Sequence, residues 1–343
     1  MSDLDTLPPE QRDAAHAALR EVIGRVTIDT MTPISGGTTG ARLFRIDAGG
    51  RRYLLRAEGL VSPLQRLRIE GPASALQNPH QYTSLRIAAE AGVAPRLYYA
   101  DEGSRIAVMD FVARQPLGSY AGGLPALATA LGELLARLHA TPVFPHLVRY
   151  SDIVGWLWSH VCRTGLFAPG TLDRYSEHFE HIRAAYVWND ANSLSSHNDL
   201  IPANILYDGK RLWMIDWESG YRNDPLVDIA IIGDSFARSA EFEYVLLRSC
   251  LGRAPDDAVR ARLRLVRALS RLYYASVLLS ASAMAPRAAP DTEMTAPTPT
   301  EFRAAIRSGR LEARTPAARH VLGKVFLASF LTDVATPGFD LSV

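Results

Sequence analysis

The feature that most restricts the fold of this chain is a pair of short motifs, SHNDLIPAN at residues 196–204 and WMIDWE at residues 213–218. The first contains a His-x-Asp triplet that ends at Asp199, and Asn204 follows after four spacer residues. The second is a short apolar run that ends on another carboxylate, Asp216. Asp199 could accept a proton from an attacking hydroxyl, while Asn204 and Asp216 could hold magnesium on nucleotide phosphates. Because magnesium usually takes only one or two carboxylates from a protein, this sparse set would suffice, and it predicts phosphoryl transfer.

Local sequence signals indicate that these groups lie close together. Pro202 is incompatible with a helix interior and disfavours helical backbone at the residue before it, so residues 197–203 are predicted to form a loop. Two short apolar runs flank the Asp-Gly pair at 208–209, which is typical of a β-hairpin turn. The hairpin would bring Asn204 and Asp216 side by side. A His-x-Asp triplet alone is usually structural, but here the residue types, the turn and the strand agree in order, which favours a functional site.

The two motifs resemble the catalytic loop and the metal-binding Asp of the protein-kinase-like fold. The resemblance is to its small-molecule branch, which contains aminoglycoside phosphotransferases and choline/ethanolamine kinases. Protein kinases carry His-Arg-Asp and Asp-Phe-Gly at these places, whereas this chain carries His-Asn-Asp at 197–199 and Asp-Trp-Glu at 216–218. Both forms are more similar to choline/ethanolamine kinases than to the antibiotic kinases.

The resemblance covers about residues 30–236 and implies the fold, the cofactors and the roles of the motif residues. The implied fold is an α+β, protein-kinase-like bilobe. Its small N-lobe, at 1–111, holds an antiparallel sheet, and its larger, mainly helical C-lobe occupies 112–343. The implied cofactors are ATP and Mg²⁺. The implied roles are catalytic for Asp199 and His197 and metal-binding for Asn204 and Asp216.

The N-terminal part of the chain has the pattern of such a lobe. A helix is predicted over 9–24, and strands over 26–33, 42–46 and 52–56. A Gly-rich turn separates the first two strands, and its glycines would let backbone amides approach phosphates closely. A plain hairpin loop is the alternative. The residues of this turn that are predicted to bind the nucleotide are Ser35, Gly36, Gly37 and Thr38.

Arg56 stands where the resembled family usually places the Lys that meets the nucleotide phosphates. Arginine can grip phosphate through two N–H groups, so it is a plausible replacement, although Arg56 could also be a solvated residue at a sheet edge. Two more strands are predicted at 96–100 and 106–112. The second would end in the hinge, where Met109 and Phe111 are predicted to bind the adenine.

The predicted helix at 80–91 departs from the family pattern. Its first two turns lack the Glu that usually pairs with the strand cation, and its only Glu, Glu90, lies near the far end. Gln81 could hydrogen-bond Arg56 but could not form an ion pair with it. Glu70, just before the helix, is another possible partner.

The rest of the chain is predicted to be mainly helical. The expected helices lie at 124–139, 150–165, 171–189, after 224, twice within 236–285, and at 315–334. The resemblance implies that Asp228 is buried and braces the catalytic loop. The segment 286–299 contains four prolines and is predicted to be a mobile loop.

The composition is that of a globular protein with a sizeable core. Of the 343 residues 48% are hydrophobic and 21% charged, and the net charge is +1. This balance suggests neither nucleic-acid binding nor a membrane-surface patch, and no apolar run approaches the length of a membrane span. The two cysteines, Cys162 and Cys250, lack metal-ligand spacing, and the acidic N-terminus lacks a signal core. We therefore expect a reduced, cytoplasmic protein.

The function that these patterns predict is ATP-dependent phosphorylation of a hydroxyl on a small metabolite, with a choline- or ethanolamine-like amino-alcohol as the leading substrate class. Alternatives are an aminoglycoside, thiamine or sugar kinase of the same fold, or a catalytically weak nucleotide-binding regulatory protein. A cationic acceptor would need a carboxylate and aromatic faces. The candidates for these are Glu218 and the rings of Trp217, Tyr221, Trp156, Trp158 and Trp188.

Overall fold

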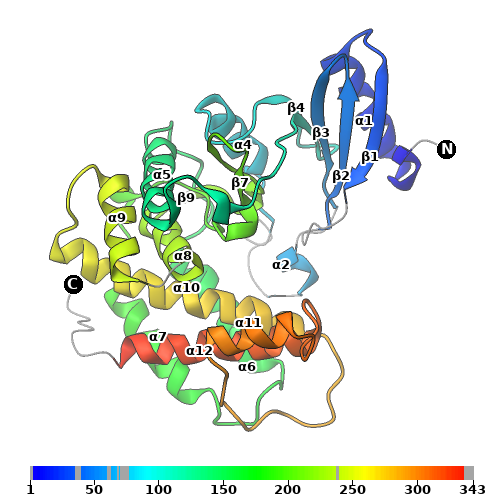
Figure 1. Cartoon of the computed structure of the whole chain (residues 1–343). Coiled ribbons are helices and arrows are strands. Elements are labelled where there is room, and N and C mark those ends of the chain that lie inside the picture. The colour runs from blue at the N-terminus through cyan, green and yellow to red at the C-terminus, as the bar shows by residue number, and fades with distance from the viewer. Residues whose placement is uncertain are drawn as a thin grey trace.

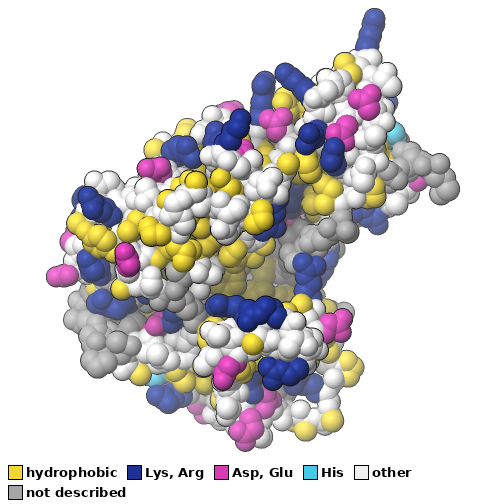
Figure 2. Space-filling view, in the orientation of Figure 1, with side chains coloured by type: hydrophobic (Ala, Val, Ile, Leu, Met, Phe, Trp, Pro, Cys, Tyr) yellow, Lys and Arg dark blue, Asp and Glu magenta, His cyan; other side chains and the backbone are white. Residues whose placement is uncertain are grey.

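The computed structural model describes residues 3–34, 40–59, 63–67, 69, 77–236 and 239–335. A small part built on a β-sheet and a larger helical part lie on either side of a cleft (Figures 1 and 2). The sheet has five antiparallel strands in the order β1-β2-β3-β5-β4. These strands are β1 (Ile28–Ile34), β2 (Arg42–Ala48), β3 (Arg51–Ala57), β4 (Leu97–Asp101) and β5 (Ile106–Asp110). The strands predicted from the sequence are therefore confirmed, and so is the kinase-like α+β fold.

The alternation of side chains along β3 separates a core face of the sheet from a cleft face. Tyr53 and Leu55 are buried on the face that α1 (Pro9–Ile23) covers. Leu54 and Arg56 point the other way and line the cleft. This follows from the strand geometry, in which successive side chains project to opposite faces. The helix predicted over 9–24 is confirmed as α1, which packs on the outside of the sheet (Figure 1).

The predicted β-hairpin is confirmed, with β7 (Ile205–Tyr207) antiparallel to β8 (Leu212–Met214). Its turn is closed by Asp208, whose Oδ1 accepts hydrogen bonds from the backbone N–H groups of Lys210 and Arg211, both at 2.8 Å. Gly209 has a φ of +94°, which a side chain would strain. A second short pair, β6 (Leu194–Ser196) with β9 (Tyr221–Asn223), holds the start of the catalytic loop.

The helical part packs around α10 (Asp257–Ala283), which contacts α6, α8 and α12. Its apolar residues recur at helical spacing, so it is buried along most of its length. The other helices are α2 (Pro63–Arg66), α4 (Gln81–Glu90), α5 (Gly123–His139), α6 (Tyr150–Arg163), α7 (Asp173–Ala185), α8 (Leu226–Phe236), α9 (Ala240–Leu251), α11 (Pro299–Arg307) and α12 (Pro316–Val334). Helix α11 was not predicted, because the prolines before it mask its start.

The Pro-rich segment 286–299, predicted to be a mobile loop, is irregular and is joined to the helical part at Asp291. The backbone of Asp291 pairs with the stretch 166–168 through two hydrogen bonds of 2.9 Å. Its side chain accepts from Lys324 at 3.1 Å and bonds His320 at 2.6 Å, both on α12. The segment then runs into α11, which begins with a capping box. Prolines restrict the chain here without preventing it from being anchored at Asp291.

No helix in the described ranges combines the length and the apolar character that crossing a bilayer requires. The lobe boundary predicted near residue 112 falls just after β5, which ends at Asp110. The division into 1–111 and 112–343 stays a prediction.

Candidate active site

The backbone of the catalytic loop is held by a buried carboxylate. Asp228 on α8 accepts the backbone N–H of His197 at 2.8 Å and that of Asn198 at 2.7 Å. Asn198 has a φ of +65°, and its side chain is fixed at both ends, by the carbonyl of Ser219 at 2.8 Å and by the amide of Asn223 at 2.7 Å. A sparsely populated backbone conformation is therefore stabilised by surrounding contacts, as is common at functional sites. The bracing role implied for Asp228 is confirmed.

Asp199 lies at the end of this loop with a partner on each carboxylate oxygen. The amide of Asn204 donates to Oδ2 at 2.9 Å and also to the Asp199 carbonyl at 2.8 Å. The hydroxyl of Tyr274 on α10 donates to Oδ1 at 2.7 Å. Burial raises the pKa of Asp199 to about 7, although both hydrogen bonds lower it. A carboxylate with a pKa near neutrality is suited to take up a proton during a reaction.

The hairpin brings Asn204 and Asp216 together, as the sequence predicted. Asn204 precedes β7 and Asp216 follows β8, and the N–H of Ile215 donates to the Asn204 carbonyl at 3.0 Å. Asp216 has a φ of +69°, a conformation that Asp adopts more readily than most residues. The two side chains therefore come from neighbouring ends of one hairpin.

The donor set at the hairpin ends fits magnesium. Both hydrogen bonds of the Asn204 side chain come from Nδ2, so its Oδ1 is the atom suited to a metal. Asp216 adds a carboxylate, and Mg²⁺ is commonly bound by one or two such oxygens together with substrate phosphates and water. Within the described part of the chain, no group of three or more His, Cys, Asp or Glu side chains could hold a metal by itself.

The side chain of His197 is fully buried and does not line the cleft. Its Nε2 is 2.8 Å from the carbonyl of Ile215, and its ring packs on Trp217 with the centroids 4.6 Å apart. Burial lowers the pKa of His197 to about 4, so the ring is neutral near pH 7. Because a carbonyl can only accept, Nε2 carries the proton. We interpret His197 as a positioning residue that joins the loop to the segment before Asp216.

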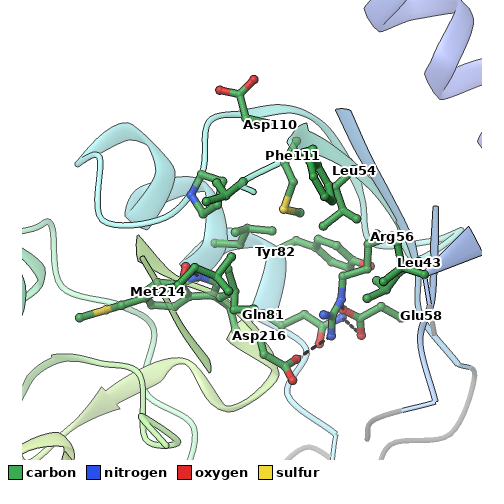
Figure 3. Close-up of a pocket in the computed structure, with 18 residues that line it drawn as sticks. Leu43, Leu54, Arg56, Glu58, Gln81, Tyr82, Asp110, Phe111, Met214 and Asp216 are labelled. Atoms are coloured by element: carbon green, nitrogen blue, oxygen red, sulfur yellow. Dashed lines mark hydrogen bonds and ion pairs between the residues drawn. The ribbon is translucent and has the colours of Figure 1, made fainter. Parts of the chain in front are cut away.

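Arg56 lies in the cleft and bonds to Glu58, Asp216 and Glu218, and Figure 3 shows the first two of these carboxylates. Its Nε donates to Glu58 at 2.8 Å, and its Nη2 donates to Asp216 at 2.7 Å and to Glu218 at 2.8 Å. Burial by itself lowers the pKa of Arg56, but Asp216, Glu58 and Glu218 together raise it well above its ordinary value. Arg56 is therefore a buried, fully charged cation directly beside Asp216.

Gln81, which was expected to hydrogen-bond Arg56, contacts it only indirectly. Gln81 on α4 donates to Glu58 at 3.1 Å, and Glu58 in turn holds Arg56. Glu58 was missed in the sequence, although it stands two positions after Arg56, where a strand would place both side chains on one face. Glu70, the other candidate, lies outside the described residues.

The cleft between the sheet and the hairpin is an apolar pocket with charges at one end (Figure 3). Its apolar lining includes Leu43, Leu54, Tyr82, Met109, Phe111 and Met214, and its charged end includes Arg56 and Asp216. The predicted adenine-binding residues Met109 and Phe111 thus both line it. The predicted phosphate-binding turn of Ser35, Gly36, Gly37 and Thr38 lies outside the described residues, and Ile34, directly before it, lines the pocket.

A second pocket opens between the end of the catalytic loop, at Ile201 and Pro202, and the C-terminal helices. Asp199 does not line it, but Tyr274, which donates to Asp199, does. The pocket is also lined by Phe302 and Arg303 on α11, and by Phe326 on α12. The rings of Tyr274 and Phe326 stack with their centroids 5.6 Å apart. The carboxylate of Asp234, also in the lining, forms hydrogen bonds of 2.7 and 2.8 Å with Arg271. Figure 2 shows hydrophobic side chains on the floor of the hollow between the two parts.

The aromatic residues proposed from the sequence for a cationic acceptor do not line this second pocket. Trp217, Tyr221 and Trp158 are buried in the core, and Trp188 packs against His146. Of the other two residues in the proposed set, Trp156 packs against the core and Glu218 accepts a hydrogen bond from Arg56. Helical spacing and residue type cannot distinguish core rings from pocket rings, and a role of these residues in binding the acceptor stays a prediction. The aromatic residues that do line the second pocket, Tyr274, Phe302 and Phe326, were not singled out in the sequence.

The fold and this site are those of the class of kinase-like phosphotransferases. The class is marked here by a cation on a strand of the sheet, Arg56, by the loop that carries Asp199, and by Asp216 at the end of the hairpin. The model of the phosphotransferase enzyme family matches residues 30–266. Because the match covers more than half of the chain, the chain belongs to this family.

Solved structures share the fold at low sequence identity. A choline/ethanolamine kinase family protein from Mesorhizobium loti superposes with a TM-score of 0.66 and 19% identity over 97% of both chains. The choline kinase LicA from Streptococcus pneumoniae superposes with a TM-score of 0.58 and 14% identity over 92% of this chain and 99% of that one. At these identities the likeness shows a common fold.

One sequence relative is closer, but only locally. The protein LicA of Haemophilus influenzae is 47% identical over 53 residues, which make up 16% of this chain and 20% of that protein. The matched stretch therefore spans about a fifth of the relative.

Proposed function

We propose that this protein is an ATP- and magnesium-dependent kinase that phosphorylates the hydroxyl of a small amino-alcohol of the choline or ethanolamine type. The observation that carries the proposal is the pair of side-chain contacts that Asp199 makes, one toward each pocket. Asn204 ties one carboxylate oxygen to the side of Asp216, and Tyr274 ties the other to the second pocket. An acceptor in the second pocket would meet both the base and the end of the nucleotide pocket.

In this proposal the first pocket binds the nucleotide. Its apolar walls would enclose the adenine next to Met109 and Phe111, and Arg56 would meet the phosphates at the charged end. The turn at Ser35, Gly36, Gly37 and Thr38 would supply backbone amides to the phosphates. Asn204 and Asp216 would hold Mg²⁺, which when bound neutralises negative charge on the phosphates.

The chemistry at Asp199 is then a single transfer. The acceptor oxygen forms a bond to the γ-phosphorus while the bond to the β–γ bridging oxygen breaks, and the hydroxyl proton passes to Asp199. Asn204 keeps the carboxylate in place through its two hydrogen bonds, and Asp228 keeps the loop backbone in place. The raised pKa of Asp199, about 7, makes the carboxylate a stronger base than an exposed Asp.

The lining of the second pocket supports a small, singly charged acceptor. The rings of Tyr274, Phe302 and Phe326 offer faces to an ammonium group, a contact worth roughly 0.5–2 kcal/mol, with the larger value where water is excluded. Arg303 is exposed at the rim, and its positive charge would disfavour a polycation. The pocket therefore fits an amino-alcohol better than an aminoglycoside. Similarity to proteins described as choline kinases supports the same substrate class.

The alternatives retained from the sequence are a thiamine or sugar kinase, and a weakly active regulatory protein. The presence of Asp199, Asn204, Asp216 and Arg56 around one cleft favours an active enzyme over the regulatory protein. A small-molecule hydroxyl substrate in the cytoplasm, without nucleic-acid or membrane partners, remains part of the proposal.

The test is a phosphotransfer assay with MgATP and a panel of acceptors, namely choline, ethanolamine, thiamine, a simple sugar and an aminoglycoside. We expect the highest kcat/KM for one of the two amino-alcohols, and no transfer without magnesium. A preference for the sugar or the aminoglycoside would overturn the acceptor class and leave the kinase activity standing. Absence of transfer to every acceptor, together with tight MgATP binding, would favour the regulatory protein.

A further inference from the structure

The carboxylate partner of Arg56 lies directly after the strand that carries this cation, not on a helix. Glu58 directly follows β3, which carries Arg56, and its Oε1 accepts from Arg56 Nε at 2.8 Å. Its other oxygen, Oε2, accepts from Gln81 on α4 at 3.1 Å. The three side chains form a relay from the cation through a carboxylate to an amide on the helix (Figure 3).

Glu58 is built into its position from two sides. Its backbone N–H donates to the carbonyl of Arg105 at 3.0 Å. Its backbone carbonyl accepts from the side chain of Gln11 at 2.8 Å, and Gln11 is itself buried on α1. Side-chain exposure is only 12% for Glu58 and 13% for Arg56. A buried carboxylate held this firmly directs the guanidinium rather than merely neutralising it.

The two ends of the Arg56 guanidinium have different neighbours. Nη2 contacts Asp216 and Glu218, both of which follow the hairpin at the metal-binding end of the pocket. Nε contacts Glu58, on the sheet side. Nucleotide phosphates would compete with Asp216 and Glu218 for Nη2, while the bond from Nε to Glu58 could persist. Glu58 is therefore the contact able to keep Arg56 oriented in both states.

We propose that Glu58, supported by Gln81, is the positioning residue that orients Arg56 for the nucleotide phosphates. It takes the place of the carboxylate that this chain lacks in the first turns of α4. The inference rests on the proposed nucleotide-binding function of the first pocket.

The relay allows a charge-swap experiment. Glu58→Gln removes the charge beside Arg56 with little change in shape. Gln81→Glu alone places a second carboxylate against Glu58, which like-charge repulsion disfavours. In the double variant every hydrogen bond can be kept, because the amide oxygen at 58 accepts from Arg56 and the amide nitrogen donates to the carboxylate at 81. The charge then sits one step further away, on α4.

The primary measurement is the Kd for MgATP by isothermal titration without an acceptor, and kcat and KM for ATP follow with the preferred acceptor. We expect Glu58→Gln to weaken MgATP binding about tenfold, Gln81→Glu to weaken it as well, and the double variant to recover most of the loss. The control is Glu90→Gln, which removes an exposed Glu at the far end of α4 and should leave the Kd unchanged. Melting temperatures establish that each variant is folded.

Glu58→Gln with a wild-type Kd would overturn the role of Glu58, and a double variant no better than Glu58→Gln would overturn the role of Gln81. If the wild type binds MgATP but phosphorylates none of the acceptors, the proposed function fails while the inference stands on the Kd values. A wild type that does not bind MgATP refutes both.

Discussion

Tyr274→Phe removes a single hydroxyl and should shift the pH dependence of the reaction. That hydroxyl donates to Oδ1 of Asp199 at 2.7 Å, while the ring stacks on Phe326 and lines the second pocket. Phenylalanine keeps the ring and its stacking. The substitution therefore isolates the hydrogen bond to the proposed base.

The direction and size of the shift follow from the contacts of Asp199. Burial raises its pKa to about 7, and the hydrogen bond from Tyr274 is the largest of the effects that lower it. A hydrogen bond to a charged group contributes about 1.5–3 kcal/mol, or roughly 1–2 pKa units. Because Asp199 is partly exposed, water can replace part of the lost bond, and we expect a rise of about one unit. Asp199 must be deprotonated to accept a proton, so the acidic limb of the profile moves to higher pH.

The assay is kcat/KM for the acceptor between about pH 5 and 9 at saturating MgATP, since this parameter reports the pKa values of the enzyme–MgATP complex before the acceptor binds. The matched control is Tyr273→Phe, the same substitution at the neighbouring residue, whose ring meets that of Tyr274 edge to face. We expect the acidic limb to lie at the same pH in the wild type and the control, and at a higher pH in Tyr274→Phe. An unchanged limb, or one moved to lower pH, would refute the reasoning.

Three further substitutions test the remaining groups. Asp199→Asn should leave MgATP binding intact and reduce kcat by about 10²–10⁴-fold, since proton acceptance is lost; full activity in a transfer assay would exclude Asp199 as the base. Asp216→Ala should weaken MgATP binding far more than Glu218→Ala in isothermal titration, because Asp216 ends the hairpin beside Asn204, and equal affinities for Asp216→Ala and wild type would remove it from the site. Arg56→Ala should raise the KM for ATP and lower kcat, and Arg56→Lys should recover part of both, since the charge is kept and the fork is lost; a silent Arg56→Ala would contradict the assignment of this cation.

Much of the site could be predicted because its signals are local. The loop around Pro202, the Asp-Gly turn and the apolar runs of the hairpin lie within about twenty residues, and each constrains the backbone directly. Alternation along β3 placed Arg56 on the face opposite Leu55 for the same reason. The prediction that Asp228 braces the catalytic loop came from the family resemblance. The physical basis of this role is the pair of hydrogen bonds that Asp228 accepts from the loop backbone.

The partner of Arg56 could have been found but was not. Glu58 follows two residues later on the same strand face, whereas the resemblance directed attention to α4, where Gln81 makes an indirect contact. The attachment of the segment 286–299 at Asp291 was not predicted for a related reason. Proline content describes local stiffness and not the contacts of Asp291 with α12.

The sequence by itself determined the catalytic loop, the hairpin and the strand that carries the cation, because each depends on residues close together in the chain. Only the tertiary structure decided which aromatic rings line the second pocket and which carboxylates contact Arg56. Tyr274 reaches Asp199 across 75 residues, and Arg56 reaches Asp216 across 160. Such contacts depend on how α10 and the sheet pack against the loop, and periodicity shows which side of a helix is apolar without showing what covers it.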